Sequence, residues 1–239
     1  MIALLRILLI LPVFILICTT GSIFCLIRPF HKNNTLVIAR TLGALAPLFG
    51  IKLIVRVPKR SVYTPQVFIA NHQNTYDLVT LTAAVSEGTV SIGKKSIRWL
   101  PFFGQLYWLC GNILIDRNNR TSARKTIDQV CQRIVDKKLS VWMFPEGTRS
   151  RGKGLLAFKM GAFHTAIHAK VPIVPVVLST TTNFKLNCLN NGYAIVEMLE
   201  PIDSEPYHTA KALAADCQQL MSDKIVTLDR EVSILNQRN

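Results

Sequence analysis

The sequence predicts an α/β fold with a mostly parallel central sheet flanked by helices, joined to an N-terminal two-helix membrane anchor. Short apolar runs of strand length alternate with helical patterns after residue 50, which is typical of a parallel sheet with helices on both faces. Two long apolar stretches precede them, and no low-complexity linker separates the two parts. We therefore expect an anchor over residues 1–50 and one α/β domain over residues 51–239.

The anchor begins with residues 7–27, a run of 21 positions without a charge. As a helix this run would extend about 31 Å, close to the hydrocarbon thickness of a bilayer. No small-residue cleavage site follows it, which favours a retained anchor over a signal peptide. Pro12, the polar break at 18–22 and a second apolar stretch at 36–50 favour two helices that dip into one leaflet, with a single full span as the alternative.

The domain contains seven candidate strands and two clear candidate helices. In TSARKTIDQVCQRIVDKK (121–138), apolar residues recur at helical spacing, and a last helix is expected at about 207–234. The strands are expected at IKLIVRV (51–57), VFIA (67–70), VSIG (90–93), NILID (112–116), VWMF (141–144), IVPVVL (173–178) and AIVEML (194–199).

The formal net charge is +14, and much of it lies in one region: residues 86–160 hold 14 Lys and Arg against 5 Asp and Glu. A basic surface beside an apolar anchor favours the surface of a membrane with anionic lipids as partner. No nucleic-acid-binding signature accompanies the charge, so no nucleic acid is expected. The six cysteines form no C-x-x-C pair, which favours free thiols in a reducing compartment over a zinc site or disulfides.

His72 and Asp77 stand five positions apart in ANHQNTYDLVT (70–80), directly after an expected strand. On one continuous helix, five residues turn the second side chain about 140° away from the first. If the strand ends near Asn71 and a helix starts near Thr75, Asp77 can reach back to His72. A histidine oriented by a carboxylate is a general base. The alternative is a loop histidine beside a helix-capping acid.

FPEGTRSRGKG (144–154) follows another expected strand and so lies at a carboxyl end, where open α/β sheets bind ligands. Gly147 permits close backbone approach, Thr148 offers a hydroxyl, and Arg149 can bind a phosphate through two parallel hydrogen bonds. Glu146 can orient Arg149 or bind a substrate hydroxyl. The alternative is a solvated basic turn.

Two further stretches follow the same logic. GNILIDRNNR (111–120) is a strand that ends in Asp116 and is followed by Arg117, which is either a phosphate ligand or the partner of Asp116. VPIVPVVL (171–178) has no reactive side chain, so we expect a buried strand that forms a wall of the site.

SIRWLPFFGQLYWLCG (96–111) carries five aromatic residues within ten positions. Such density is typical of a membrane interface or of the mouth of an acyl-chain pocket, and core packing is the alternative. His164 and His168 are spaced as in H-E-x-x-H but lack its glutamate, so we expect them on a helix surface. No G-x-S-x-G, P-loop or G-x-G-x-x-G motif is present.

Taken together, NHQNTYD, GNILIDR, FPEGTRS and VPIVPVVL resemble the four ordered blocks of the glycerolipid acyltransferase family. The resemblance extends from the anchor to about residue 200 and is strongest to the short form of Gram-negative bacteria. It implies transfer of a fatty acyl group from acyl-carrier protein or acyl-CoA to the 2-hydroxyl of lysophosphatidate, which gives phosphatidate. No cofactor and no metal are implied.

The resemblance also implies roles for the site residues. His72 would take the proton of the acceptor hydroxyl, and Asp77 would orient and stabilise its ring. Arg149, Arg117 and Lys94 would hold the acceptor's phosphate. Because the donor thioesters are cytosolic, the domain is expected on the cytoplasmic face of the inner membrane. The same chemistry on another acceptor, such as glycerol 3-phosphate, and a non-catalytic basic membrane-binding protein are the alternatives.

Overall fold

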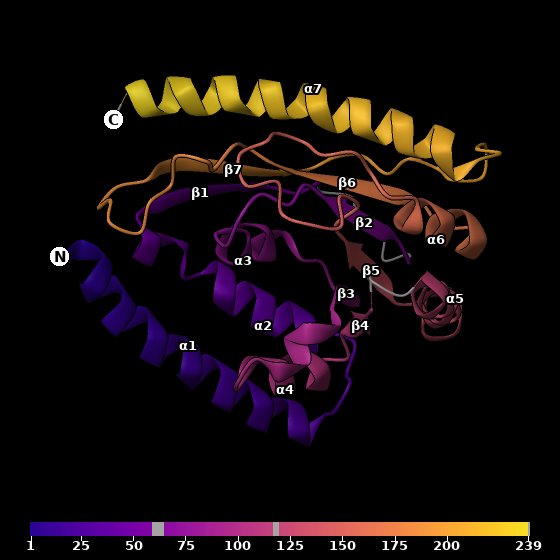
Figure 1. Cartoon of the computed structure of the whole chain (residues 1–239), viewed down its shortest axis with the longest axis horizontal. Helices are drawn as coiled ribbons and strands as arrows, with labels where there is room; N and C mark the ends of the chain where they lie inside the picture. Colours follow the sequence, from indigo (N-terminus) through magenta and orange to yellow (C-terminus); the bar gives the residue numbers. More distant parts are fainter. Residues whose placement is uncertain (59–64, 117–119, 239) are drawn as a thin grey trace.

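A computed structural model describes residues 1–58, 65–116 and 120–238 (Figure 1). All seven expected strands and both expected helices of the domain form. The strands are β1 (Ile51–Arg56), β2 (Val67–Ala70), β3 (Thr89–Lys94), β4 (Ile113–Ile115), β5 (Ser140–Met143), β6 (Ile173–Leu178) and β7 (Gly192–Met198). The helices are α1 (Ile2–Ile27), α2 (Asn34–Gly43), α3 (Asp77–Thr80), α4 (Phe103–Leu109), α5 (Arg120–Lys137), α6 (Gly161–Ala169) and α7 (Ala210–Gln237), with 3-10 turns η1 (Ala46–Phe49), η2 (Leu81–Ala84) and η3 (Lys95–Trp99).

The strands form one sheet in the order β1-β7-β6-β2-β5-β3-β4. Five neighbouring pairs are parallel and one, β6–β7, is antiparallel, so the predicted mostly parallel sheet is confirmed. Strands β6, β2, β5, β3 and β4 run in the same direction, and their carboxyl ends therefore share one edge of the sheet. The segments that follow these strands carry most of the predicted site residues.

Alternating residues of the strands face two different helical layers. In β2, Val67 and Ile69 pack toward α5, α6 and α7, whereas Phe68 and Ala70 pack toward α2, α3 and η2. Figure 1 shows these two layers on opposite sides of the sheet. Burial on both faces explains why β2 and β6 are continuously apolar, and β5 is so after Ser140, rather than alternating in sequence.

Helix α7 lies across the sheet and is fixed by charged contacts at its C-terminal half. Arg56 on β1 pairs with Glu231 of α7 and, at 3.3 Å, with Glu197 of β7. Lys224 of α7 also contacts Glu197, at 2.9 Å. These pairs cross-link the helix to the β1–β7 edge of the sheet.

The predicted two-helix anchor is wrong in its second helix. Helix α2 forms where expected but has only 10 residues, and Ile38, Ala39 and Leu42 on it are buried. It lies between α1 and the sheet (Figure 1), so its apolar side chains are used in the protein core. Among the described helices, α1 is the one that is long and apolar enough to cross a membrane.

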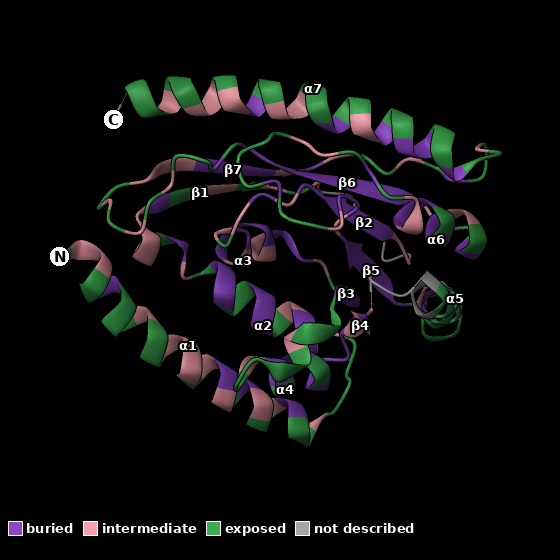
Figure 2. Ribbon diagram, in the orientation of Figure 1, coloured by how far each residue is buried: buried purple, intermediate pink, exposed green. Residues whose placement is uncertain are grey.

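Helix α1 contacts the domain at both of its ends. Near its start, the buried Arg6 guanidinium donates to the carbonyl oxygens of Leu186 (2.9 Å), Cys188 and Leu189 (2.8 Å). Near its end, the Cys25 and Cys110 sulfur atoms lie 3.7 Å apart. The opposite side of α1 is largely exposed, as Figure 2 shows. The helix therefore lies along the domain, with one apolar face uncovered.

Candidate active site

The candidate site lies where three neighbouring strands, β6, β2 and β5, end at the same edge of the sheet. The segment after β2 carries His72, and the segment after β5 carries the FPEGTR loop. Backbone bonds join the two: Ser150 N–H donates to His72 O at 2.8 Å, and Arg151 N–H donates to Gln73 O at 3.0 Å. The sheet register thus places two predicted motifs, about 70 residues apart in sequence, side by side.

His72 and Asp77 meet as the sequence analysis predicts. The strand ends at Ala70, α3 begins at Asp77, and His72 Nδ1 lies 2.6 Å from Asp77 Oδ2. The same oxygen accepts backbone N–H bonds from Gln73 (2.7 Å) and Asn74 (3.2 Å), which fixes the carboxylate. Asp77 is buried, and the imidazole stacks on Phe144 with ring centroids 4.1 Å apart. Because Nδ1 faces the carboxylate, Nε2 is the nitrogen that can take a proton from a substrate.

Three amide side chains that the sequence analysis missed hold this turn against the end of β6. Asn71 exchanges two hydrogen bonds with the backbone of Leu178, at 2.8 and 2.9 Å. Gln73 donates to Ser179 O at 2.8 Å and accepts from Thr181 N–H at 2.9 Å. Asn74 donates to the Thr181 hydroxyl at 2.9 Å. The run NHQN after a buried strand was the available signal, because three amides in a turn must find partners when they are buried.

Glu146 has a different place from the one expected. Its Oε1 accepts the backbone N–H of His72 at 2.6 Å, and its Oε2 accepts that of Leu156 at 3.0 Å. The residue is almost completely buried, and this burial raises the pKa of its carboxyl group above the ordinary value. The two oxygens therefore fix two backbone segments of the site, one at His72 and one at Leu156. The carboxylate positions His72 from the main chain while Asp77 positions it from the ring.

The FPEGTR loop turns sharply and exposes Thr148 and Arg149. Gly147 has a φ of +70°, and a Cβ atom there would lie 2.9 Å from Lys159 Nζ. The Lys159 side chain therefore packs against the backbone of the loop at Gly147. Thr148 and Arg149 are both exposed and lie in the segment just before Ser150, which bonds to His72. This arrangement places Arg149 and Lys159 on the loop that adjoins the dyad.

Two further residues, Lys94 and Asp116, lie along the same edge of the sheet. Lys94 is exposed at the last position of β3, the neighbour of β5. Asp116 follows β4 and contacts Lys95 Nζ at 3.6 Å. Arg117 lies outside the described residues.

An apolar cavity of about 410 Å³ adjoins the turn that carries His72 and Asp77. Thr75 and Tyr76, the two residues before Asp77, line it together with Ile10 and Phe14 of α1. Leu42, Leu45, Phe49, Leu78, Val79 and Leu186 complete the wall. The helix with the exposed apolar face therefore also forms one side of a cavity next to the dyad.

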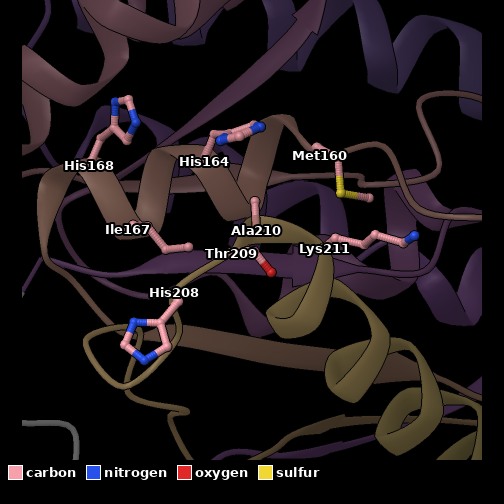
Figure 3. Close-up of a pocket in the computed structure, with 8 residues that line it drawn as sticks. All are labelled: Met160, His164, Ile167, His168, His208, Thr209, Ala210 and Lys211. Atoms are coloured by element: carbon pink, nitrogen blue, oxygen red, sulfur yellow. The ribbon is translucent and has the colours of Figure 1, made fainter.

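A second cleft, of about 420 Å³, lies between α6 and the start of α7. Its histidines are His164, His168 and His208, and Figure 3 shows that their three rings do not converge. His164 and His168 are exposed on α6, as predicted.

In class, the molecule is an α/β protein with a histidine–aspartate pair at the carboxyl edge of a mostly parallel sheet. Residues 53–179 match the family described as Acyltransferase. The 1-acyl-sn-glycerol-3-phosphate acyltransferase of Escherichia coli (strain K12) is 53% identical over 223 residues, which cover 92% of this chain and 91% of that protein. The protein of the same name from Haemophilus influenzae is 50% identical over 237 residues, 98% of this chain and 99% of its own length.

The chain belongs to the acyltransferase family. The human 1-acyl-sn-glycerol-3-phosphate acyltransferase alpha is 32% identical and covers 87% of the chain. The crystal structure of the 1-acyl-sn-glycerophosphate acyltransferase from Thermotoga maritima matches 95% of the chain with a TM-score of 0.75 and 19% identity, which shows a shared fold.

Proposed function

We propose that this protein transfers a fatty acyl group from a thioester to the 2-hydroxyl of 1-acyl-sn-glycerol 3-phosphate, which yields phosphatidate for phospholipid synthesis. The observation that carries the proposal is the 2.6 Å contact between His72 Nδ1 and Asp77 Oδ2 at the carboxyl edge of the sheet. The relatives that bear this activity in their names match the chain over nearly its whole length.

In the proposed mechanism, His72 acts as general base. Its Nε2 takes the proton of the acceptor's 2-hydroxyl while that oxygen attacks the thioester carbonyl. The buried Asp77 carboxylate stabilises the imidazolium that forms. Collapse of the tetrahedral intermediate breaks the carbon–sulfur bond, and the proton passes from His72 to the thiol that leaves. Ester, thiol and neutral histidine result, and no covalent enzyme intermediate is needed.

The acceptor's phosphate is proposed to bind at the FPEGTR loop. Arg149 is exposed there and offers a planar guanidinium for two parallel bonds, and Lys159 lies over Gly147 of the same loop. In this loop, Gly147 permits close approach of the backbone to the phosphate, and Thr148 offers its hydroxyl. Lys94, at the end of β3, extends the basic surface for the phosphate, and Arg117, outside the described residues, is proposed as a further phosphate ligand from its place in the sequence. Glu146 acts indirectly, through the backbone of His72.

The apolar cavity beside the turn supports a fatty substrate. Its lining is almost wholly hydrophobic, it starts at Thr75 and Tyr76, and it extends toward α1. An acyl chain lying there would have its carbonyl end near His72. Acyl-carrier protein and acyl-CoA are both proposed as donors because each presents such a chain on a thioester.

The proposed location is the cytoplasmic face of the inner membrane. Helix α1 has exposed leucines along its outer face, and the net charge of +14 favours a surface with anionic lipids. The thioester donors are cytosolic, so the catalytic edge must face the cytoplasm.

Purified protein in detergent and in vesicles tests the proposal. Acyl-carrier protein and CoA thioesters are offered with lysophosphatidate, glycerol 3-phosphate and an uncharged lysolipid as acceptors. We expect phosphatidate from lysophosphatidate, formed about 10²- to 10⁴-fold more slowly with His72→Ala. Arg149→Ala should raise KM for lysophosphatidate about tenfold or more and change KM for the thioester little, because a charge-assisted bond contributes about 1.5–3 kcal/mol. Equal turnover of glycerol 3-phosphate would reassign the acceptor, and no transfer at all would contradict the proposal.

A further inference from the structure

We propose that the segment from η3 to α4, residues 95–109, is a second membrane-binding element that inserts its exposed apolar side chains, Trp99, Leu100, Phe102 and Trp108, into the same leaflet as α1. The inference rests on the proposed membrane location. It adds a contact that neither the length nor the hydropathy of α1 implies, because the segment is short and lies about 70 residues farther along the chain.

Large apolar side chains of this segment face solvent in an unusual cluster. Trp99 is 75% exposed, Trp108 55%, Leu100 50% and Phe102 48%. By contrast, Trp142, in β5, is 4% exposed and stacks on Phe68 in the core. Single exposed apolar residues are ordinary on a protein surface, but a contiguous group marks an interaction site. Tryptophan in particular is enriched where a protein meets the membrane interface.

Two exposed phenylalanines, one in this segment and one beside it, have a strained backbone conformation. Phe102 has a φ of +63°, and the neighbouring Phe30, which is also about half exposed, has a φ of +57°. A bulky residue at positive φ is strained by about 1–3 kcal/mol, and such strain is retained where the surrounding structure imposes it for a function. The segment is also closely packed: a Cβ atom on Gly104 would lie 2.5 Å from Arg98 O, so the start of α4 lies directly against η3.

The segment packs directly against α1 and the residues that follow it. Phe103 stacks on Phe14 of α1 at 5.8 Å, and Trp108 meets the edge of Phe30 at 4.9 Å. Phe30 N–H also donates to Leu109 O at 3.1 Å. In Figure 2, α4 and α1 lie on the same side of the molecule, and both carry exposed residues. One rigid surface therefore presents both elements to the same partner.

The charges around the cluster favour a lipid leaflet over a second copy of the chain. Lys94, Lys95 and Arg98 are exposed beside it, and the Arg98 guanidinium lies 4.8 Å from the Trp99 ring centre. Aromatic rings at the interface with cations at the level of the phosphates match the layered polarity of an anionic membrane. Two copies meeting through this face would bring these like charges together.

Tryptophan fluorescence gives a direct test, because the chain has three tryptophans and one of them is a buried control. Full-length variants keep one tryptophan each, with phenylalanine at the other two positions. They are placed in vesicles of phosphatidylglycerol and phosphatidylcholine, with the phosphatidylcholine either plain or brominated on its acyl chains. We expect Trp99 and Trp108 to lose most of their emission in brominated vesicles, while Trp142 keeps its emission and reports an intact fold. Unquenched Trp99 and Trp108 that iodide reaches from water would overturn the proposal.

An activity measurement separates this inference from the proposed reaction. Trp99→Ser should lower transfer to a vesicle-borne acceptor several-fold and leave transfer to a short-chain acceptor in detergent unchanged, and Trp99→Phe should restore the former. Loss on both acceptors, or on neither, would contradict a membrane role for Trp99. Failure of the unmodified protein on every acceptor would count against the reaction alone, since the fluorescence result does not depend on turnover.

Discussion

Four separate contacts fix the position of His72, each through a different part of the histidine. Its backbone N–H donates to Glu146, its carbonyl accepts from Ser150, its Nδ1 faces Asp77, and its ring stacks on Phe144. Rotation of the ring and shift of the backbone are therefore both restricted. A general base gains most from such fixing, because proton transfer needs Nε2 within hydrogen-bond reach of the acceptor hydroxyl.

The first prediction concerns the dyad. His72→Ala should lower turnover by about 10² to 10⁴, the usual contribution of a general base, and leave the protein folded. Asp77→Asn should also be severe, because it removes the charge that stabilises the imidazolium. Acyl transfer measured beside circular dichroism checks both. Near-normal turnover in His72→Ala would contradict the mechanism.

The second prediction concerns Glu146 and pH. Burial raises its pKa above the ordinary 4.5, so the folded protein holds this proton more tightly than the unfolded chain. Below pH 4.5 the carboxyl group is protonated in both states, and its burial does not lower the free energy of unfolding. As the pH rises from 4.5 through the raised pKa of the folded protein, the buried group becomes charged and the free energy of unfolding falls. Glu146→Gln lacks the titration. Unfolding of both proteins across this pH range should show the wild type losing stability relative to the variant.

Glu146→Gln should also slow catalysis at every pH. One backbone N–H, of His72 or of Leu156, would then face an amide N–H instead of an acceptor. A wild-type stability that stays level or rises relative to the variant would show that burial does not control this carboxyl group.

The third prediction uses two glycines of the same loop. Gly147 and Gly154 have φ values of +70° and +72°, but a Cβ atom meets Lys159 at the first position and nothing within 4 Å at the second. Alanine at either position costs about 1–2 kcal/mol of backbone strain. Gly147→Ala should in addition displace Lys159 and raise KM for the acceptor, whereas Gly154→Ala should not. Equal KM values of the two variants for the acceptor would contradict a role of Lys159 in phosphate binding.

The sequence predicted the site only in part, for reasons visible in these residues. The His72–Asp77 contact could be predicted because a strand end followed by a helix start fixes a short local geometry. Glu146 was expected to orient Arg149 or to bind a substrate hydroxyl, yet one of its oxygens accepts the backbone N–H of His72, since the parallel pairing of β2 with β5 brings those backbones together. Such a contact depends on strand order, which local sequence does not specify.

At the scale of elements, hydrogen bonds of polar side chains as well as apolar packing fix the relative positions of segments. Gln73 and Asn71 join the catalytic turn to the end of β6, and Thr180 beyond it is bonded through its N–H to Asp229 of α7 at 2.6 Å. The long C-terminal helix is thereby connected to the turn through one loop. Arg6 does the same for α1 and the 186–189 loop.

The fourth prediction concerns that Arg6 contact. Arg6→Met keeps the length of the side chain but leaves the carbonyl oxygens of Leu186, Cys188 and Leu189 without this donor. We expect a loss of about 2 kcal/mol in the free energy of unfolding, because hydrogen bonds from a charged group contribute about 1.5–3 kcal/mol and these acceptors are partly buried. Thermal unfolding in detergent and proteolysis of the 185–191 loop measure it. Arg40→Met, at an exposed position of α2, is the control and should have little effect. Equal stability of the two variants would show that the Arg6 hydrogen bonds do not stabilise the fold.

Elements were predicted well where the pattern was periodic and less well where burial decided their role. The strands and the helices at 121–138 and 207–234 form close to the expected bounds. The stretch at 36–50 was expected in the membrane because it is apolar, but α1 and η2 cover it. Apolarity alone does not distinguish a core helix from a membrane helix of the same length.

At the scale of the whole molecule, the two ends of α1 determine how the protein can meet a bilayer. Arg6 is bonded to the 186–189 loop, and Phe30, just after the helix, is bonded to Leu109, so both ends belong to the catalytic domain. A helix of 26 residues is about 39 Å long, and one that crossed the bilayer would carry its first end to the opposite side. The contacts therefore favour a helix that lies in the plane of one leaflet, with its leucines in the lipid.

The fifth prediction follows from this geometry. Cysteine is introduced at Ile2→Cys, or at Ser222→Cys on α7 as a reference for the catalytic domain, in a background where the partly exposed Cys131 and Cys188 are replaced by serine. Intact spheroplasts are treated with a membrane-impermeant thiol reagent. If α1 lies in the cytoplasmic leaflet, both cysteines stay unlabelled until the cells are lysed, and after lysis in detergent both react. Labelling of Ile2→Cys from outside, with Ser222→Cys still protected, would establish a full span and would require the Arg6 contact to break in the membrane.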